Sequence, residues 1–232
     1  MSTIADNLSS VSARIGAATQ AAGREPSSVN LLAVSKTKPA QAIREAHAAG
    51  QHHFGENYLQ EALAKQAELT DLDVTWHFIG PIQSNKTKAI AEHFAWVHSV
   101  DRLKIAQRLS EQRPPHLPPL NICLQVNISG EASKAGCEPQ DLAALASAVA
   151  ALPRLRLRGL MAIPEPSKEA TEQNATFARV TALRDGLSLG LDTLSMGMSD
   201  DLEAAIAQGA TWVRIGTALF GARDYSTPNA PV

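Results

Sequence analysis

One pattern occurs eight times along this chain: a short apolar or β-branched run, followed by an alanine-rich amphipathic stretch. The runs lie at 31–35, 52–56, 76–80, 96–100, 122–127, 158–163, 193–197 and 212–216. Their lengths and periods are those of strands, and the stretches between them have the period of helices. Eight strand–helix units within 232 residues are typical of a closed parallel barrel with its helices outside. The sequence therefore predicts the α/β class and a (β/α)8 TIM barrel.

An open doubly wound sheet is the alternative architecture. It more often has five or six strands and a glycine-rich first turn, and the sequence has neither. A further helix is expected before the barrel, because the apolar residues there fall on one helical stripe, namely Ile4, Leu8, Val11 and Ile15. We therefore expect a single domain over residues 1–232, with the N-terminal helix at about 1–23 and the barrel at 30–221.

Composition argues against several functional classes. The 21 basic and 23 acidic residues are interspersed and give a net charge of -2, so no basic stripe is available for nucleic acid. The uncharged, alanine-rich stretch 142–153 is shorter than a membrane-spanning helix, and the N-terminus lacks the features of a signal peptide. Cys123 and Cys137 form no metal or disulfide pattern, which suits a reducing compartment. We therefore expect a cytoplasmic protein without nucleic acid or membrane partners.

The first strand ends in two lysines, Lys36 and Lys38, after the apolar Leu32 and Val34. Alternate residues of a barrel strand face the lumen, and functional residues gather at the carboxyl ends of the strands. These four residues would therefore share the lumen side, with Lys36 at the functional end. The simpler alternative is that both lysines extend from the strand end into water.

The loops after the seventh and eighth strands have the residues of a phosphate site. The residues concerned are Ser195, Gly197 and Ser199 in the first loop, and Gly216 and Thr217 in the second. In such barrels these two loops commonly hold a phosphate at helix N-termini. Ordinary turn and capping chemistry is the alternative, and Asp200 and Asp201 would fit it.

Arg214 should point into the barrel near the predicted phosphate site, because it alternates with Trp212 and Gly216. A buried guanidinium needs an acceptor, which would be a carboxylate such as Glu56 or a ring nitrogen of a ligand. A desolvated lysine beside a cation favours its neutral form, which is nucleophilic towards aldehydes. Phosphate, aldehyde and heteroaromatic nitrogen together describe pyridoxal 5'-phosphate (PLP). Lys36 would then bind its aldehyde, while Lys38 lowers the proton affinity of Lys36 or orders water.

Several segments of the chain closely resemble the pyridoxal phosphate homeostasis protein family. These segments are AVSKTKP, FGENYLQEA, WHFIGPIQSNK, QVNISGEASKAG, GLMAIPEP, LSMGMSDDLEAAI and VRIGTALFG, which together extend over 33–221. The resemblance implies a barrel like the N-terminal domain of bacterial alanine racemase. It also implies that PLP is bound covalently, as a Schiff base, through the lysine that matches Lys36.

Similarity to the racemase barrel implies further roles in cofactor binding. It would place Ser195, Gly216 and Thr217 on the phosphate, Arg214 on the pyridine nitrogen and Asn57 in the pocket. Where the racemase pattern has a histidine facing the ring, this chain has Ile163. Lys134 matches a lysine in a family loop, although a solvated loop lysine is the simpler interpretation. His52, His53, His77 and His98 suit packing in the core or at the barrel mouth.

The same residues favour a carrier over an enzyme. Racemases of this type take a second acid–base group, a tyrosine, from an additional domain, and sixteen residues after Gly216 are too few to form one. Arg214 on the ring nitrogen would also weaken the cofactor as an electron sink. We therefore expect a monomeric protein that holds PLP for apo-PLP enzymes and catalyses no reaction of its own. A racemase, lyase or decarboxylase using Lys36 as base, or a Schiff-base aldolase, is the alternative.

Overall fold

The eight strands close into a parallel barrel in which each strand pairs with its neighbours in chain order. A computed structural model describes residues 2–130 and 135–222. The strands are β1 (Asn30–Val34), β2 (His53–Glu56), β3 (Thr75–Phe78), β4 (Trp96–Val100), β5 (Leu120–Gln125), β6 (Leu155–Met161), β7 (Thr193–Ser195) and β8 (Trp212–Ile215). All eight overlap the predicted runs, and pairing of β1 with β8 completes the cylinder. The predicted fold class is confirmed.

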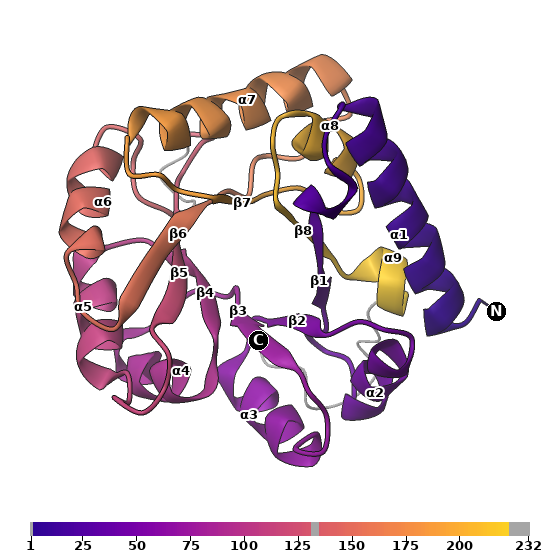
Figure 1. Ribbon diagram of the computed structural model, residues 1–232, viewed down its shortest axis with the longest axis horizontal. Coiled ribbons are helices and arrows are strands. Elements are labelled where there is room, and N and C mark those ends of the chain that lie inside the picture. Colours follow the sequence, from indigo (N-terminus) through magenta and orange to yellow (C-terminus); the bar gives the residue numbers. More distant parts are fainter. Residues whose placement is uncertain (1, 131–134, 223–232) are drawn as a thin grey trace.

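Helices surround the barrel and cover its outer face (Figure 1). They are α1 (Ile4–Ala21), α2 (Ala40–Ala48), α3 (Leu59–Glu68), α4 (Thr87–His93), α5 (Leu103–Gln112), α6 (Leu142–Ala150), α7 (Ala170–Gly186), α8 (Leu202–Ala207) and α9 (Thr217–Phe220). Short 3-10 turns occur at Pro26–Ser28 and Ser84–Lys86. Each strand is followed by a helix, which is the (β/α)8 arrangement.

The expected additional helix is α1, which begins after an N-cap at Thr3. The Thr3 hydroxyl accepts from the Asp6 amide while the Asp6 carboxylate accepts from the Thr3 amide, a capping box. The buried stripe of α1 includes Leu8, Val11 and Ile15. This helix lies beside α8 and α9 (Figure 1), which have only 6 and 4 residues. The long α1 therefore covers a part of the wall that two short helices leave open.

The apolar residues form two layers separated by the strands. Along β1, Ala33 belongs to the large outer core between strands and helices, whereas Leu32 and Val34 pack in the lumen with Ile79 and Trp212. A second lumen cluster contains Trp96, Cys123 and Met161. The predicted lumen side of β1 is therefore confirmed for the two residues before the lysines.

Both cysteines, Cys123 and Cys137, are free and buried. In the two described ranges, no helix combines the length and the apolar composition that crossing a bilayer requires. Across those same ranges, the histidines, cysteines and carboxylates form no group of three or more that is arranged to hold a metal ion.

Candidate functional site

Lys36 lies in the turn between β1 and α2, where it lines a small cleft. The other residues of this cleft are Val34, Lys38, Gly216, Thr217 and Gly221. Lys36 is half-buried, and the Lys38 ammonium donates to the carbonyl oxygen of Ala222 at 2.7 Å. The structure therefore brings the predicted reactive lysine together with two of the predicted phosphate residues, although one comes from the first unit of the barrel and the others from the last.

The turn that carries Lys36 is strained. Thr37 has a φ of 62°, in the left-handed region that β-branched residues avoid, at a cost of about 1–3 kcal/mol. The Thr37 amide donates to the Glu61 carboxylate at 2.6 Å, which anchors the turn to α3. Because a strained turn persists only where its surroundings fix it, Glu61 holds the backbone on which Lys36 is mounted.

A buried ion cluster lies behind this turn. The Lys65 ammonium donates to Glu56 Oε1 at 2.8 Å, to Glu61 Oε1 at 2.5 Å and to the Ser35 carbonyl oxygen at 2.8 Å. The Ser35 hydroxyl also donates to Glu56 Oε1, at 2.6 Å. Burial raises the pKa of Glu56, and the Lys65 cation opposes that shift. Sequence reasoning missed this cluster, because Glu61 and Lys65 have the i,i+4 spacing of an ordinary surface pair.

Arg214 points into the barrel, as predicted, but it does not pair with Glu56. Its Nη1 donates to Ser195 O at 2.6 Å and Oγ at 2.9 Å, and its Nη2 donates to the Ala162 carbonyl oxygen at 2.9 Å. Of the two acceptors considered for Arg214, the Glu56 carboxylate is therefore wrong, because Lys65 holds it. Burial lowers the pKa of Arg214 to about 10, while the charge of Asp201 acts in the opposite direction.

Ser195 is the last residue of β7 and is fully buried. Its hydroxyl lies 2.8 Å from His98 Nδ1 and accepts a hydrogen bond from Arg214. Ser195 lies within the run predicted as the seventh strand, and its hydroxyl faces His98 and Arg214 in the lumen, while its predicted contact with the phosphate stays a prediction. In the following loop, Gly197 has a φ of 94°, and a Cβ there would lie 2.5 Å from the Ala205 Cβ. Gly197 therefore allows this loop to approach α8 closely.

Three buried oxygens near the ends of β1 and β2 have no hydrogen-bond partner among the described residues. They are Thr37 Oγ1, Glu56 Oε2 and Asn57 Oδ1. Buried polar atoms are normally paired, so these orphaned oxygens suit a site that takes a polar ligand or water. Asn57 is further fixed by close packing, because a Cβ on Gly80 would lie 2.2 Å from the Asn57 carbonyl oxygen.

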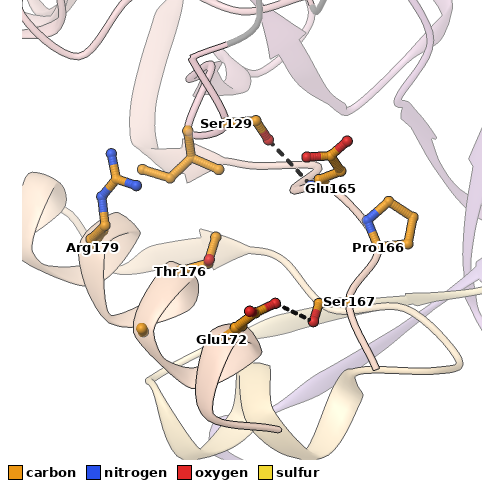
Figure 2. A pocket seen from close by; sticks show the side chains of 9 residues that line it. Ser129, Glu165, Pro166, Ser167, Glu172, Thr176 and Arg179 are labelled. Atoms are coloured by element: carbon orange, nitrogen blue, oxygen red, sulfur yellow. Dashed lines mark hydrogen bonds between the residues drawn. The ribbon is translucent and has the colours of Figure 1, made fainter. Parts of the chain in front are cut away.

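A larger cavity, of about 380 Å³, lies between the loops that follow β5 and β6 and the helix α7 (Figure 2). Its polar lining residues are Ser129, Glu165, Ser167, Glu172, Thr176 and Arg179. Two hydrogen bonds shape it: the Glu165 amide donates to Ser129 Oγ, and the Ser167 hydroxyl donates to Glu172. None of the predicted cofactor residues lines this cavity.

Two further residues were singled out from the family resemblance. Ile163 is 44% exposed, and Lys134 lies outside the described residues.

The fold and the cleft define a class of protein: a closed (β/α)8 barrel with a lysine after the first strand and a buried arginine in the last. The model of the family described as "Alanine racemase, N-terminal domain" matches residues 7–224, almost the whole chain. This match shows the class to which the barrel belongs.

Individual relatives narrow the class. The chain is 76% identical to the pyridoxal phosphate homeostasis protein of Pseudomonas aeruginosa, over 98% of this chain and 99% of that protein. It is 57% identical to the protein of the same name from Escherichia coli K12, over 97% and 99% of the two chains. Among solved structures, PipY of Synechococcus elongatus with PLP bound superposes with a TM-score of 0.83 at 46% identity, covering 94% of this chain and all of PipY. The chain belongs to the pyridoxal phosphate homeostasis protein family.

Proposed function

We propose that this protein binds PLP covalently through Lys36 and acts in intracellular PLP homeostasis. The observation that carries the proposal is the shared cleft of Lys36, Gly216 and Thr217, with Arg214 buried two residues before Gly216. Family membership supports the same cofactor, because a family member has been solved with PLP bound.

The residues present fit this cofactor. PLP supplies an aldehyde, with which the amine of Lys36 condenses to a Schiff base as water leaves. Gly216 and Thr217, at the start of α9, would hold the phosphate, and Arg214 would donate to the pyridine nitrogen. Asn57, with its unpaired buried oxygen, would contact the ligand or a water beside it. Ser195 would contribute through Arg214, to which it is hydrogen bonded.

We further propose that the protein carries PLP without catalysing a reaction of its own. A guanidinium can only donate hydrogen bonds, so Arg214 would keep a ring nitrogen unprotonated and the cofactor weakly activated. The names of the relatives agree with a homeostasis role. Recipients would be apo-PLP enzymes in the cytoplasm, supplied by a monomer. The free, buried Cys123 and Cys137 suit that reducing compartment.

Substitution of Lys36 tests the covalent proposal. Lys36→Ala should abolish the visible absorbance of the PLP adduct and leave no borohydride-reducible modification, with a loss of PLP affinity of at least about tenfold. The matched control is Lys88→Ala, because Lys88 is an exposed lysine on α4. A reducible adduct of full occupancy in Lys36→Ala would contradict the proposal.

Isotope exchange tests the absence of catalysis. The PLP-loaded protein should exchange no α-hydrogen of the common amino acids in deuterated water above the rate given by free PLP. Steady exchange that disappears in Lys36→Ala would instead establish the racemase or lyase alternative, with Lys36 as the base.

A further inference from the structure

A continuous chain of hydrogen bonds crosses the lumen and ends at Arg214. His53 Nδ1 lies 3.0 Å from His77 Nε2, and His77 Nδ1 lies 2.9 Å from His98 Nε2. His98 Nδ1 then lies 2.8 Å from Ser195 Oγ, which accepts from Arg214 at 2.9 Å. These five residues belong to β2, β3, β4, β7 and β8, so only the closed barrel assembles them.

Arg214 fixes the direction of every bond in this chain. Because a guanidinium only donates, Ser195 Oγ is the acceptor of that bond, and its single hydrogen is directed to the other neighbour, His98 Nδ1. A neutral His98 then carries its hydrogen on Nε2 and donates it to His77 Nδ1. By the same argument His77 donates from Nε2 to His53 Nδ1.

The three histidines of this hydrogen-bond chain, His53, His77 and His98, are held in the neutral form. Burial lowers the pKa of His98 to about 3, with a further contribution from the charge of Arg214. Burial also lowers the pKa of His77, well below its usual value, and that of the half-buried His53. At neutral pH the chain therefore contributes oriented dipoles and no net charge.

These dipoles all point the same way. Each residue directs an acceptor atom towards Arg214 and a hydrogen away from it, so the negative ends of Ser195, His98, His77 and His53 face the guanidinium. Aligned hydrogen bonds in a low-dielectric interior strengthen one another. The direct partners of Arg214 are otherwise two backbone carbonyl oxygens. The hydrogen-bond chain therefore stabilises the buried Arg214 cation without placing a carboxylate against it.

We propose that His98, supported by His77 and His53, is a positioning residue that keeps Arg214 charged and aimed at the group bound in the cleft. The proposal rests on the proposed function, because Arg214 acts there on the pyridine ring of PLP. A carboxylate in place of Ser195 and the histidines would neutralise the charge of Arg214, whereas the neutral histidines leave that charge available to a ligand. Trp96 stacks on His77 with ring centroids 5.5 Å apart, and Trp212 lies edge-on to His53 at 4.9 Å, so aromatic packing holds the rings in place.

The hydrogen positions can be measured on the unaltered protein. Long-range ¹H–¹⁵N correlation spectra of ¹⁵N-histidine-labelled protein should show His53, His77 and His98 as neutral rings with the hydrogen on Nε2. Each signal is assigned by its loss in the corresponding His→Phe variant. A hydrogen on Nδ1 of His98, or a charged His98 ring at neutral pH, would overturn the proposal without bearing on whether Lys36 binds PLP.

A graded series of variants tests the positioning role. His98→Phe should weaken PLP binding about tenfold and shift the visible band of the Lys36 adduct. PLP binding should weaken about threefold in His77→Phe and less than about twofold in His53→Phe. His98→Asn, whose amide oxygen can still accept from Ser195, should recover most of the loss. Met161→Leu is the control, because Met161 is fully buried in the lumen and is not part of the hydrogen-bond chain.

The order of these effects separates positioning from packing. His77 and His98 are equally buried, so a packing role predicts equal losses that follow the unfolding midpoints, and that result would overturn the proposal. Unchanged PLP binding in His98→Phe, together with its loss in Lys36→Ala, would refute the positioning role alone. If Lys36→Ala also binds PLP normally, the proposed function fails as well.

Discussion

Two buried cations lie near the candidate site, and the barrel stabilises them in opposite ways. Lys65 contacts two carboxylates, Glu56 and Glu61, at 2.8 and 2.5 Å. Arg214 contacts backbone carbonyl oxygens and a serine backed by neutral histidines. The first cation is neutralised where it lies and serves to hold the Lys36 turn. The second keeps its charge available to a ligand, so the comparison distinguishes a structural cation from a binding one.

The largest expected effect on stability comes from removing the neutralised cation. Lys65→Met should lower the free energy of unfolding by about 3–5 kcal/mol, because Glu56 would be left buried and charged. Arg214→Met should cost only about 1–2 kcal/mol, because its direct partners are neutral. The Ser195 carbonyl oxygen also still accepts from the Ala162 amide. Urea unfolding followed by circular dichroism measures both values.

Binding should reverse that order. Arg214→Met is expected to lose more PLP affinity than Lys65→Met, when each is measured by titration under conditions where the variant is folded. The double variant Lys65→Met/Glu56→Gln is the control, and it should recover part of the lost stability because the buried negative charge is gone. Equal losses of stability in the two single variants would break the distinction between the two cations.

The next effect concerns pH and the neutral histidines. Their native pKa values are depressed, to about 3 for His98 and well below the usual value for His77. The unfolded chain therefore binds protons more tightly, so their contribution is present above about pH 6.5 and is lost as the pH falls below it. Between pH 7 and 5.5 these two residues should together remove about 2.5 kcal/mol of stability.

A matched variant isolates this contribution. Over the same pH interval His98→Phe should lose about 1.2 kcal/mol less stability than the unaltered protein, because one buried histidine no longer titrates. The measurement is urea unfolding at closely spaced pH values. An identical pH dependence in the two proteins would show that His98 is not held neutral by the fold.

The smallest effect concerns the strained turn. Thr37→Gly should stabilise the protein by about 0.5–1 kcal/mol, because relief of the left-handed strain outweighs the greater entropy of unfolded glycine. PLP affinity should nevertheless fall by about two- to fivefold, since the Lys36 turn becomes less rigid. Ser188→Gly is the control, with a φ of 52° at an exposed position. It should raise the unfolding midpoint without changing PLP binding, and a similar fall in affinity there would refute the link to Lys36.

Sequence reasoning predicted what depends on chain order and period. The eight strands, the helix α1, the lumen side of Leu32 and Val34, and the meeting of Lys36 with Gly216 all follow from strand alternation and barrel closure. The bond of Lys36 to PLP stays a prediction, as do the roles of five further residues towards PLP: Asn57, Ser195, Arg214, Gly216 and Thr217.

Sequence reasoning failed where the contacts of a side chain depend on its orientation or on neighbours that are distant in the sequence. Ser195 ends β7, within the run predicted as a strand, but its contacts with His98 and Arg214 could not be predicted from the sequence. Glu56 was suggested as an acceptor for Arg214, because nothing in the spacing of α3 indicates that Lys65 is buried beneath the Lys36 turn. The histidines were expected to pack in the core. They do, but their bonding into one chain depends on how three strands are aligned.

The cleft joins the first strand–helix unit to the last, and α1 reinforces that junction, where Asn7 donates to the carbonyl oxygen of Leu219 on α9. During synthesis, Lys36 therefore leaves the ribosome long before its partners Gly216 and Thr217 exist. No partial product can form the complete cleft, so full affinity for the cofactor should arise only after the barrel has closed. Loading with PLP would then report that a molecule has finished folding.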